Sequence, residues 1–328
     1  MNLGAFPTVA VPTKVAFPAG GRLTLVSGSP VISSDQTGKS VIYYTPDQYG
    51  AFPIIKNGVI RPVYFSDDLQ LTMTSAFTGS GIFDLFGVER GGRGVMVAGT
   101  AWSVATAGSG ARGTTPGQTE LIRVAGMSVN RWGMPGLSAE NATYIEPMEG
   151  RYLGSVFIDS SAGQTSCHVS YGQSRKWGLS NADNRRDIIL KAGDSTASWT
   201  YSTNTARASN NSSANSLTVF CGLADEEIVT RVIQRCQLLT SASLIGINTV
   251  GIGWNVTNAF SGKVGIVGNA LNGGTNITTQ GDAVGEYIAA PSLGLNTVTS
   301  LEQSPNAGGG NTYFGTETNM VLSAKWRA

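Results

Sequence analysis

The chain has few side chains that could act as nucleophile or base. It has 328 residues, with a single histidine, His168, and three cysteines, Cys167, Cys221 and Cys236. Serine and cysteine hydrolases need a base beside the nucleophile, and that base is usually histidine. In the run 166–170, strand alternation sends the Cys167 and His168 side chains to opposite faces. We therefore predict no catalytic residue here and expect a packed or surface histidine.

The same residues do not suggest a metal or cofactor site. Three cysteines is an odd number, and they lack the close-set pairs that a structural zinc site uses. Apart from the adjacent Cys167, whose side chain should point to the opposite face, the lone histidine has no carboxylate or thiol partner placed nearby in the sequence. We predict no metal and no cofactor. The cysteines should be reduced and buried, and a disulfide within or between subunits is the alternative.

Acidic residues lie close together at three places in the sequence. Glycosidases use two carboxyl groups roughly 5 to 9.5 Å apart, and this spacing across strands cannot be read from one sequence. We expect loop, capping or surface acids in each case, and keep polysaccharide cleavage as an alternative. The candidates are Asp67 with Asp68, Asp84 with Glu89, and Asp225, Glu226 and Glu227.

One glycine-rich segment matches a dinucleotide-binding pattern literally. Residues Gly108–Gly113 read GSGARG, or G-x-G-x-x-G. That pattern binds a pyrophosphate only where it joins a strand to a helix N-terminus. Here the next residues are Thr-Thr-Pro-Gly-Gln, which favour a turn. We predict a flexible loop.

Tryptophans are the remaining candidates for ligand contact. Their rings can stack on sugars, but large aromatic side chains more commonly pack in β-sandwich cores or subunit contacts. Both interpretations stay open for Trp102, Trp132, Trp177 and Trp254.

Composition indicates the elements that position these side chains. The 43 glycines and the low charged content of 13% differ from average globular usage in the direction of turns and strands. Polar positions are occupied mainly by Ser, Thr, Asn and Gln, which suit strand faces and tight turns. Apolar or alternating runs recur every eight to twelve positions, the spacing typical of a sandwich or barrel. The sequence predicts an all-β fold.

The N-terminal segment, residues 1–20, reads as an extended arm. Prolines follow Phe6, Val11 and Phe17, and proline at this spacing forbids a helix. An arm that carries apolar side chains must bury them against something else. We predict docking on a particle or a neighbouring subunit through Phe6, Val9, Val11 and Phe17, with a disordered terminus as the alternative.

We predict two β-sandwich or jelly-roll-like modules after the arm, at residues 21–140 and 141–328. Turn formers cluster at Met134–Asn141, where the periodicity lapses. The segment Asp225–Leu239 fits both a helix, with Ile228, Val232, Cys236 and Leu239 on one face, and a strand. Its β-branched content and its context favour the strand.

Charge and hydropathy argue against two classes of partner. The 22 basic and 21 acidic side chains give a net charge of +1, so no basic face for nucleic acid is expected. Residues 1–20 lack the basic start and continuous apolar run of a signal peptide. The uncharged stretch Leu238–Val256 is diluted by Ser, Thr, Asn and Gly, which favours buried strands over membrane insertion.

Several motifs together resemble a known group. The run Gly21–Val31 (GRLTLVSGSPV), followed by Asp35–Gly38 (DQTG) and Ile42–Pro46 (IYYTP), resembles the opening of virion proteins of phages and prophages from proteobacterial hosts. Later segments are similar too: Ala101–Ser103, Thr119–Asn130, Gly150–Gly154, Ala162–Thr165, Trp199–Thr203, Asn210–Asn215 and Gly315–Trp326. The resemblance implies a virion component and brings no catalytic residue.

The sequence therefore predicts a bacteriophage structural protein, a fibre or decoration subunit, and not an enzyme. It would be made in the host cytoplasm, reside in the virion and contact capsid, collar or tail proteins. A homotrimer is expected by analogy with phage fibres. The alternatives are a fibre tip that binds a host cell-surface glycan and, third, a polysaccharide-degrading spike.

Overall fold

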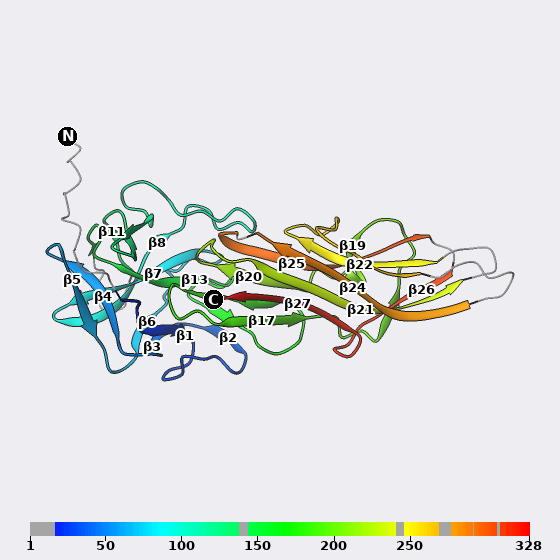
Figure 1. Cartoon of the computed structure of the whole chain (residues 1–328), viewed down its shortest axis with the longest axis horizontal. Helices are drawn as coiled ribbons and strands as arrows, with labels where there is room; N and C mark the ends of the chain where they lie inside the picture. Colours follow the sequence, from blue (N-terminus) through cyan, green and yellow to red (C-terminus); the bar gives the residue numbers. More distant parts are fainter. Residues whose placement is uncertain (1–16, 138–143, 241–245, 269–276, 291, 307–308) are drawn as a thin grey trace.

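A computed structural model describes residues 17–137, 144–240, 246–268, 277–290, 292–306 and 309–328. The molecule is elongated, with short N-terminal strands at one end and long C-terminal strands towards the other, while the C-terminus lies near the middle (Figure 1). Apart from one short 3-10 helix, η1 (Ser209–Asn211), the regular elements are strands. The predicted all-β fold class is confirmed.

Strands of the first half of the chain are short or of moderate length. They are β1 (Gly21–Thr24), β2 (Gln36–Lys39), β3 (Val41–Pro46), β4 (Ala51–Lys56), β5 (Val59–Tyr64), β6 (Leu69–Thr72), β7 (Ile82–Arg90), β8 (Arg93–Ala101), β9 (Leu121–Val124), β10 (Met127–Asn130), β11 (Met134–Pro135), β12 (Tyr144–Ile145), β13 (Arg151–Phe157) and β14 (Thr165–Cys167).

The second half contains the longest strands. Its elements are β15 (Arg175–Trp177), β16 (Leu179–Asn181), β17 (Asp187–Ala192), β18 (Ser198–Thr200), β19 (Arg207–Ala208), β20 (Ser216–Cys221), β21 (Ile228–Thr240), β22 (Ile247–Trp254), β23 (Gly265–Gly268), β24 (Ile277–Ala289), β25 (Gly294–Asn306), β26 (Gly309–Phe314) and β27 (Met320–Arg327).

The N-terminal end is built around the sheet β8-β7-β13-β10-β9, with β16 also paired to β13. A separate hairpin, β4–β5, covers part of it. Asn57 and Gly58 join the hairpin strands with φ of 53° and 73°, the positive φ pair of a two-residue type I′ turn. A Cβ added at Gly87 of β7 would lie 2.7 Å from the Phe52 ring. Glycine at that position therefore lets the hairpin lie directly on the sheet.

Two large sheets form the other end. One has the order β2-β14-β15-β20-β25-β22-β23, with β19 paired to β25. The other has the order β17-β27-β21-β26-β18, with β24 paired along the opposite edge of β21. Inward side chains of both sheets share one hydrophobic cluster, which includes Val219 and Ile252 of the first sheet and Val232 and Leu322 of the second. This packing is that of a β-sandwich.

The segment that fits either a helix or a strand in the sequence is the long strand β21. Its side chains alternate strictly along the strand: Ile228, Val232, Cys236 and Leu238 are buried, whereas Val229 and Leu239 are exposed. The strand interpretation is confirmed because β21 is paired on both sides over most of its length.

Hydrogen bonds cross the position where the sequence predicts a module boundary. Strand β13 pairs with both β7 and β10, and β14 pairs with β2. Strand β11 also pairs with β12, so strands from either side of residue 140 share three sheets. The division into modules at residues 21–140 and 141–328 stays a prediction.

Candidate functional site

The single histidine directly follows β14, and its Nε2 lies 3.4 Å from the Thr37 hydroxyl. His168 is 8% exposed, and its Nδ1 accepts a hydrogen bond of 3.1 Å from the Lys176 backbone N–H. Burial, with Arg175 nearby, lowers the pKa of His168. Burial also raises the pKa of Cys167 to about 12, so this thiol stays protonated at neutral pH.

All three cysteines are buried and free, as the sequence analysis expected. Burial raises the pKa of Cys221 to about 12 and also raises that of Cys236. Such thiols are poor nucleophiles because little thiolate forms. Within the part of the chain that the structure describes, no group of three or more histidine, cysteine or acidic side chains is placed to hold a metal ion.

Asp84, one of the acidic candidates, is completely buried and bonded to an arginine. Arg112 Nε and one of its terminal nitrogens lie 2.7 and 2.9 Å from the two Asp84 carboxylate oxygens. Ser155 donates a further bond of 2.6 Å to the same carboxylate. Both oxygens thus accept hydrogen bonds from inside the chain, and the residue is 0% exposed.

Arg112 comes from the glycine-rich loop and links Asp84 on β7 with Gly222, which directly follows β20. Its guanidinium donates to the Gly222 carbonyl at 2.7 Å and lies 4.3 Å from the centre of the Trp102 ring. Gly110 of the same loop packs on Gly294, where a Cβ would be 2.7 Å from the Gly294 Cα. The segment is a loop, as predicted, and its glycines permit close contact with β25. Its flexibility stays a prediction. We call the cluster of Asp84, Arg112, Tyr152, Ser155 and Gly222 the latch.

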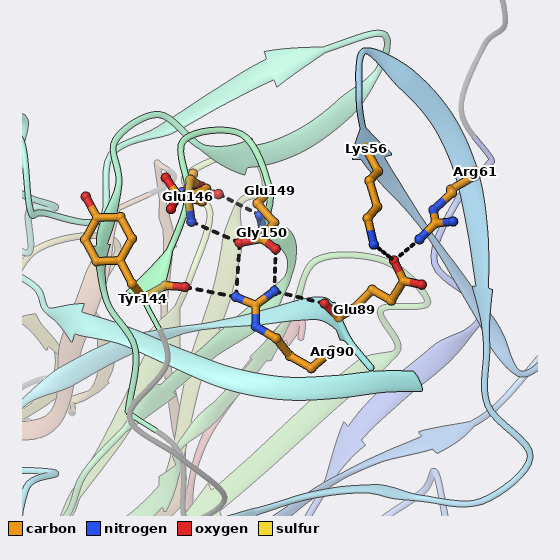
Figure 2. Close-up of polar contacts among 9 residues, drawn as sticks. Lys56, Arg61, Glu89, Arg90, Tyr144, Glu146, Glu149 and Gly150 are labelled. Atoms are coloured by element: carbon orange, nitrogen blue, oxygen red, sulfur yellow. Dashed lines mark hydrogen bonds and ion pairs between the residues drawn. The ribbon is translucent and has the colours of Figure 1, made fainter. Parts of the chain in front are cut away.

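Glu89, the second acid of that candidate pair, belongs to a separate network at the surface. Lys56 and Arg61 of the β4–β5 hairpin converge on its carboxylate, with Lys56 Nζ at 2.7 Å, and Arg90 faces Glu149 (Figure 2). The Arg90 guanidinium also donates 2.9 Å to the Tyr144 carbonyl. The network fastens the hairpin and a neighbouring loop to the end of β7.

In the third acidic group, Asp225 and Glu226 are likewise engaged in ion pairs, whereas Glu227 is exposed. Arg185 makes two bonds to Asp225, of 2.7 and 2.9 Å, and Glu226 lies 3.3 Å from Arg327. These contacts attach the segment before β21 to β27 and to the turn before β17. They give no pair of free carboxylates.

Asp67 and Asp68 lie at the surface between two polar hollows of about 500 and 480 Å³. Asp68 accepts hydrogen bonds from Ser27, Gly28 and Thr45. Burial alone would raise the pKa of Asp68, but these bonds outweigh it and hold the pKa below its ordinary value. A general acid in glycoside hydrolysis needs the opposite shift.

Glu302 is a buried carboxyl that the sequence analysis did not single out. It is 0% exposed, and burial raises its pKa. Perturbed buried acids often mark active sites. Here, however, one oxygen accepts from Trp199 at 2.6 Å and the other from Arg207 at 2.9 Å. Glu302 therefore secures the chain segment 199–210 to β25.

The four candidate tryptophans divide by exposure. Trp102 and Trp177 are 5% and 4% exposed and pack in the core. Trp254 is half-buried beside Tyr287, with ring centres 6.0 Å apart. Trp132 is half-buried, and its indole N–H lies 2.9 Å from Glu120. The structure brings none of the four into the hollows beside Asp67.

Of the predicted arm residues, Phe6, Val9 and Val11 lie outside the described residues. Phe17 is half-buried, and its ring centre is 6.1 Å from that of Tyr49. Next to it Ala19 is buried, and its carbonyl accepts a bond of 2.9 Å from Asn184. The end of the arm is thus anchored on its own chain. Docking through the arm stays a prediction.

An exposed apolar surface is the feature that the sequence analysis missed. We define the outer face as the solvent side of strands β17, β27, β21 and β24. Strand register aligns Ile189, Lys325, Val229 and Ile288 in one row across it. The three apolar side chains are 49%, 47% and 59% exposed. They lie far apart in the sequence, so only the pairing register reveals the row.

Two further rows follow along the outer face. The next contains Lys191, Ser323, Arg231 and Glu286, and the third contains Val321, Ile233 and Val284. Apolar rows thus alternate with a charged row on a face that the described residues leave uncovered. Separately, no helix in the described ranges is long and apolar enough to cross a membrane.

Comparisons with known proteins add no functional information. No family model matches the chain, and no curated protein matches its sequence. Among solved structures, the chain is similar to one of infectious bursal disease virus, Gx strain, at 11% identity and a TM-score of 0.24, over 95% of this chain and 69% of that chain. It is also similar to the mosquito-larvicidal Cry4Aa toxin of Bacillus thuringiensis, at 9% identity and a TM-score of 0.23, over 97% and 54% of the two chains. Scores this low carry no argument.

Proposed function

We propose that this chain is a structural subunit of a bacteriophage particle, which works by folding, assembling and presenting a β-rich surface. The observation that carries the proposal is the outer face. Its row of Ile189, Val229 and Ile288 is exposed on a regular sheet, and exposed apolar patches on folded proteins commonly mark contacts with other proteins.

The state of the reactive side chains supports the same proposal. Asp84 and Glu302 are the most deeply buried of the acids discussed above, and arginines pair with both. His168 is packed, and burial raises the pKa of all three thiols. These groups stabilise the fold and are not arranged around a shared cavity, which favours assembly over catalysis.

The location of the chain can be tested on purified particles. We expect peptides of this chain to co-sediment with particles from the bacterial strain that encodes it, at a fixed ratio to the major capsid protein. Recovery of the chain only from the particle-free lysate would contradict the proposal. The homotrimer and the choice between capsid, collar and tail remain predictions.

Docking through the arm has its own test. Residues 1–16 should be removed while Phe17, Ala19 and Gly20 are kept, because Ala19 is buried and Gly20 donates 2.8 Å to the Ala51 carbonyl. We expect the truncated chain to fold and to be lost from particles. Normal incorporation would end the docking hypothesis and leave the rest of the proposal in place.

Glycan binding is the second candidate function, favoured by the hollows beside Asp67. Tyr64 lines one of them and is 75% exposed, and such a ring can stack on a sugar. We expect Tyr64→Ala or Asp67→Asn to weaken binding to host surface polysaccharide about tenfold or more. Tyr144→Ala, which removes a 53% exposed ring elsewhere, serves as the control. Equal binding by all three variants would exclude this site.

A further inference from the structure

We propose that the outer face packs against the same face of a second copy of this chain, around a two-fold axis parallel to the strands. This inference rests on the proposed function and names the partner of that surface. In such a face-to-face pair the order of the strands is reversed, so β17 of one copy lies over β24 of the other and β27 lies over β21.

The two-fold rotation brings the apolar rows of one copy into contact with the apolar rows of the other. Ile189 of one copy lies over Ile288 of the other, and Val229 lies over the aliphatic stem of Lys325. Lysine stems cover apolar surface while their ammonium groups remain in water. In the third row Val321 lies over Ile233. Each exposed apolar side chain of these rows is thereby removed from water, which stabilises the pair in proportion to the buried area.

The charged row also matches, because it is basic at one edge and acidic at the other. Lys191 on β17 comes over Glu286 on β24 of the second copy. Within one chain Glu286 lies 3.5 Å from Arg231. Among the charged side chains that the structure describes on this face, Lys191 is the one without an ion pair. In the dimer, Glu286 of each copy provides a carboxylate for Lys191 of the other copy, so this ion pair forms twice.

The outer face is close in size to one side of a stable contact. Its strands β17, β27, β21 and β24 have 6, 8, 13 and 13 residues. Strand spacings of ~4.8 Å and rises of ~3.4 Å per residue give a face of roughly 650 Å². Stable protein interfaces bury about 800 Å² on each partner. Stacked sheets of this kind pack with nearly aligned strands.

Sedimentation velocity of the full chain over a range of concentrations tests the pair. We expect a concentration-dependent dimer, and we expect Ile288→Glu to weaken it about a hundredfold because a charge is buried twice in the contact. Ile266→Glu is the matched control, since both isoleucines are 59% exposed and Ile266 lies on β23 of the other sheet. The control should dimerise like the unmodified chain.

Charge-reversal variants at Lys191 and Glu286 test the predicted orientation of the two-fold axis. Lys191→Glu and Glu286→Lys should each weaken the dimer about tenfold, whereas the two changes combined in one chain should restore it to within about threefold. Without rescue, the predicted apposition of Lys191 and Glu286 is wrong. In a single chain the two positions are separated by β27 and β21, so rescue cannot come from an internal pair.

The results also separate this inference from the proposed function. A chain that stays monomeric at all concentrations, responds equally to Ile288→Glu and Ile266→Glu, or forms a trimer insensitive to Ile288→Glu overturns the two-fold contact. If that same chain is still recovered in particles, the structural role stands and another surface makes the assembly contact. Absence from particles despite a specific dimer would instead contradict the role in the particle.

Discussion

The latch and the outer face invert the usual distribution of side chains. In the latch, the Asp84 carboxylate is fully buried and the Arg112 side chain is 12% exposed, and their polar contacts are made inside the chain. On the outer face, Ile189, Val229 and Ile288 are apolar and exposed, with no cover from the described residues. Buried charge with complete partners indicates a role in the fold, and exposed apolar surface without partners indicates a role outside it.

Breaking the latch should have the largest effect on stability. Arg112→Met leaves the Asp84 carboxylate fully buried without its counter-ion, and such a loss costs about 3–5 kcal/mol of unfolding free energy. Chemical denaturation measures the change. Arg61→Met, which removes an arginine whose side chain is 42% exposed, should cost less than about 1 kcal/mol. Equal losses of unfolding free energy in the two variants would show that the latch does not stabilise the fold more than a surface ion pair does.

The backbone contact beside the latch should be the next most sensitive. Gly110→Ala places a Cβ 2.7 Å from both the Gly294 Cα and the Leu293 carbonyl, and such overpacking costs about 1–3 kcal/mol. Gly281→Ala on β24 is the control, because its Cβ would meet Val267 at 3.6 Å, an ordinary contact. Thermal unfolding should separate the two. A destabilised Gly281→Ala with a normal Gly110→Ala would refute this account.

A buried carboxylate that accepts several hydrogen bonds should make the free energy of unfolding depend on pH. Burial would raise the pKa of Asp194, but bonds from Asn215, Thr196 and Asn210 outweigh it and lower the pKa. Its contribution is therefore present above the unfolded pKa of about 4 and is lost as the pH falls below that value. Asp194→Asn should flatten the loss of stability below pH ~4, measured by denaturation at several pH values. An unchanged slope would contradict this assignment.

The surface network around Glu89 should have the smallest effect. The Lys56 and Arg61 side chains are 50% and 42% exposed, so water and salt screen these pairs. Glu89→Gln should change the unfolding free energy by less than about 1 kcal/mol, and less still at high salt. A loss as large as that of Arg112→Met would mean that the network of Figure 2 holds the hairpin as firmly as the latch holds the loop.

Local patterns of the sequence predict the fold class and many strands, because alternation and turn residues act over short distances. They also place Cys167 in a strand and the GSGARG segment in a loop, although the strand ends at Cys167 and His168 lies outside it. What the sequence does not give is pairing between distant strands. Spacing suggests Asp84 and Glu89 as a pair, yet the partner of Asp84 is Arg112. The row on the outer face likewise depends on the register of four strands.

The most direct test of the central claim is whether the outer face is covered in solution. Because the chain's own cysteines are buried, a cysteine introduced by Ile288→Cys or Ile266→Cys would be the reactive thiol. The rate of maleimide labelling should fall with rising protein concentration for Ile288→Cys and stay constant for Ile266→Cys. Concentration-independent labelling at both positions would show that the outer face stays open to water, and would contradict the account.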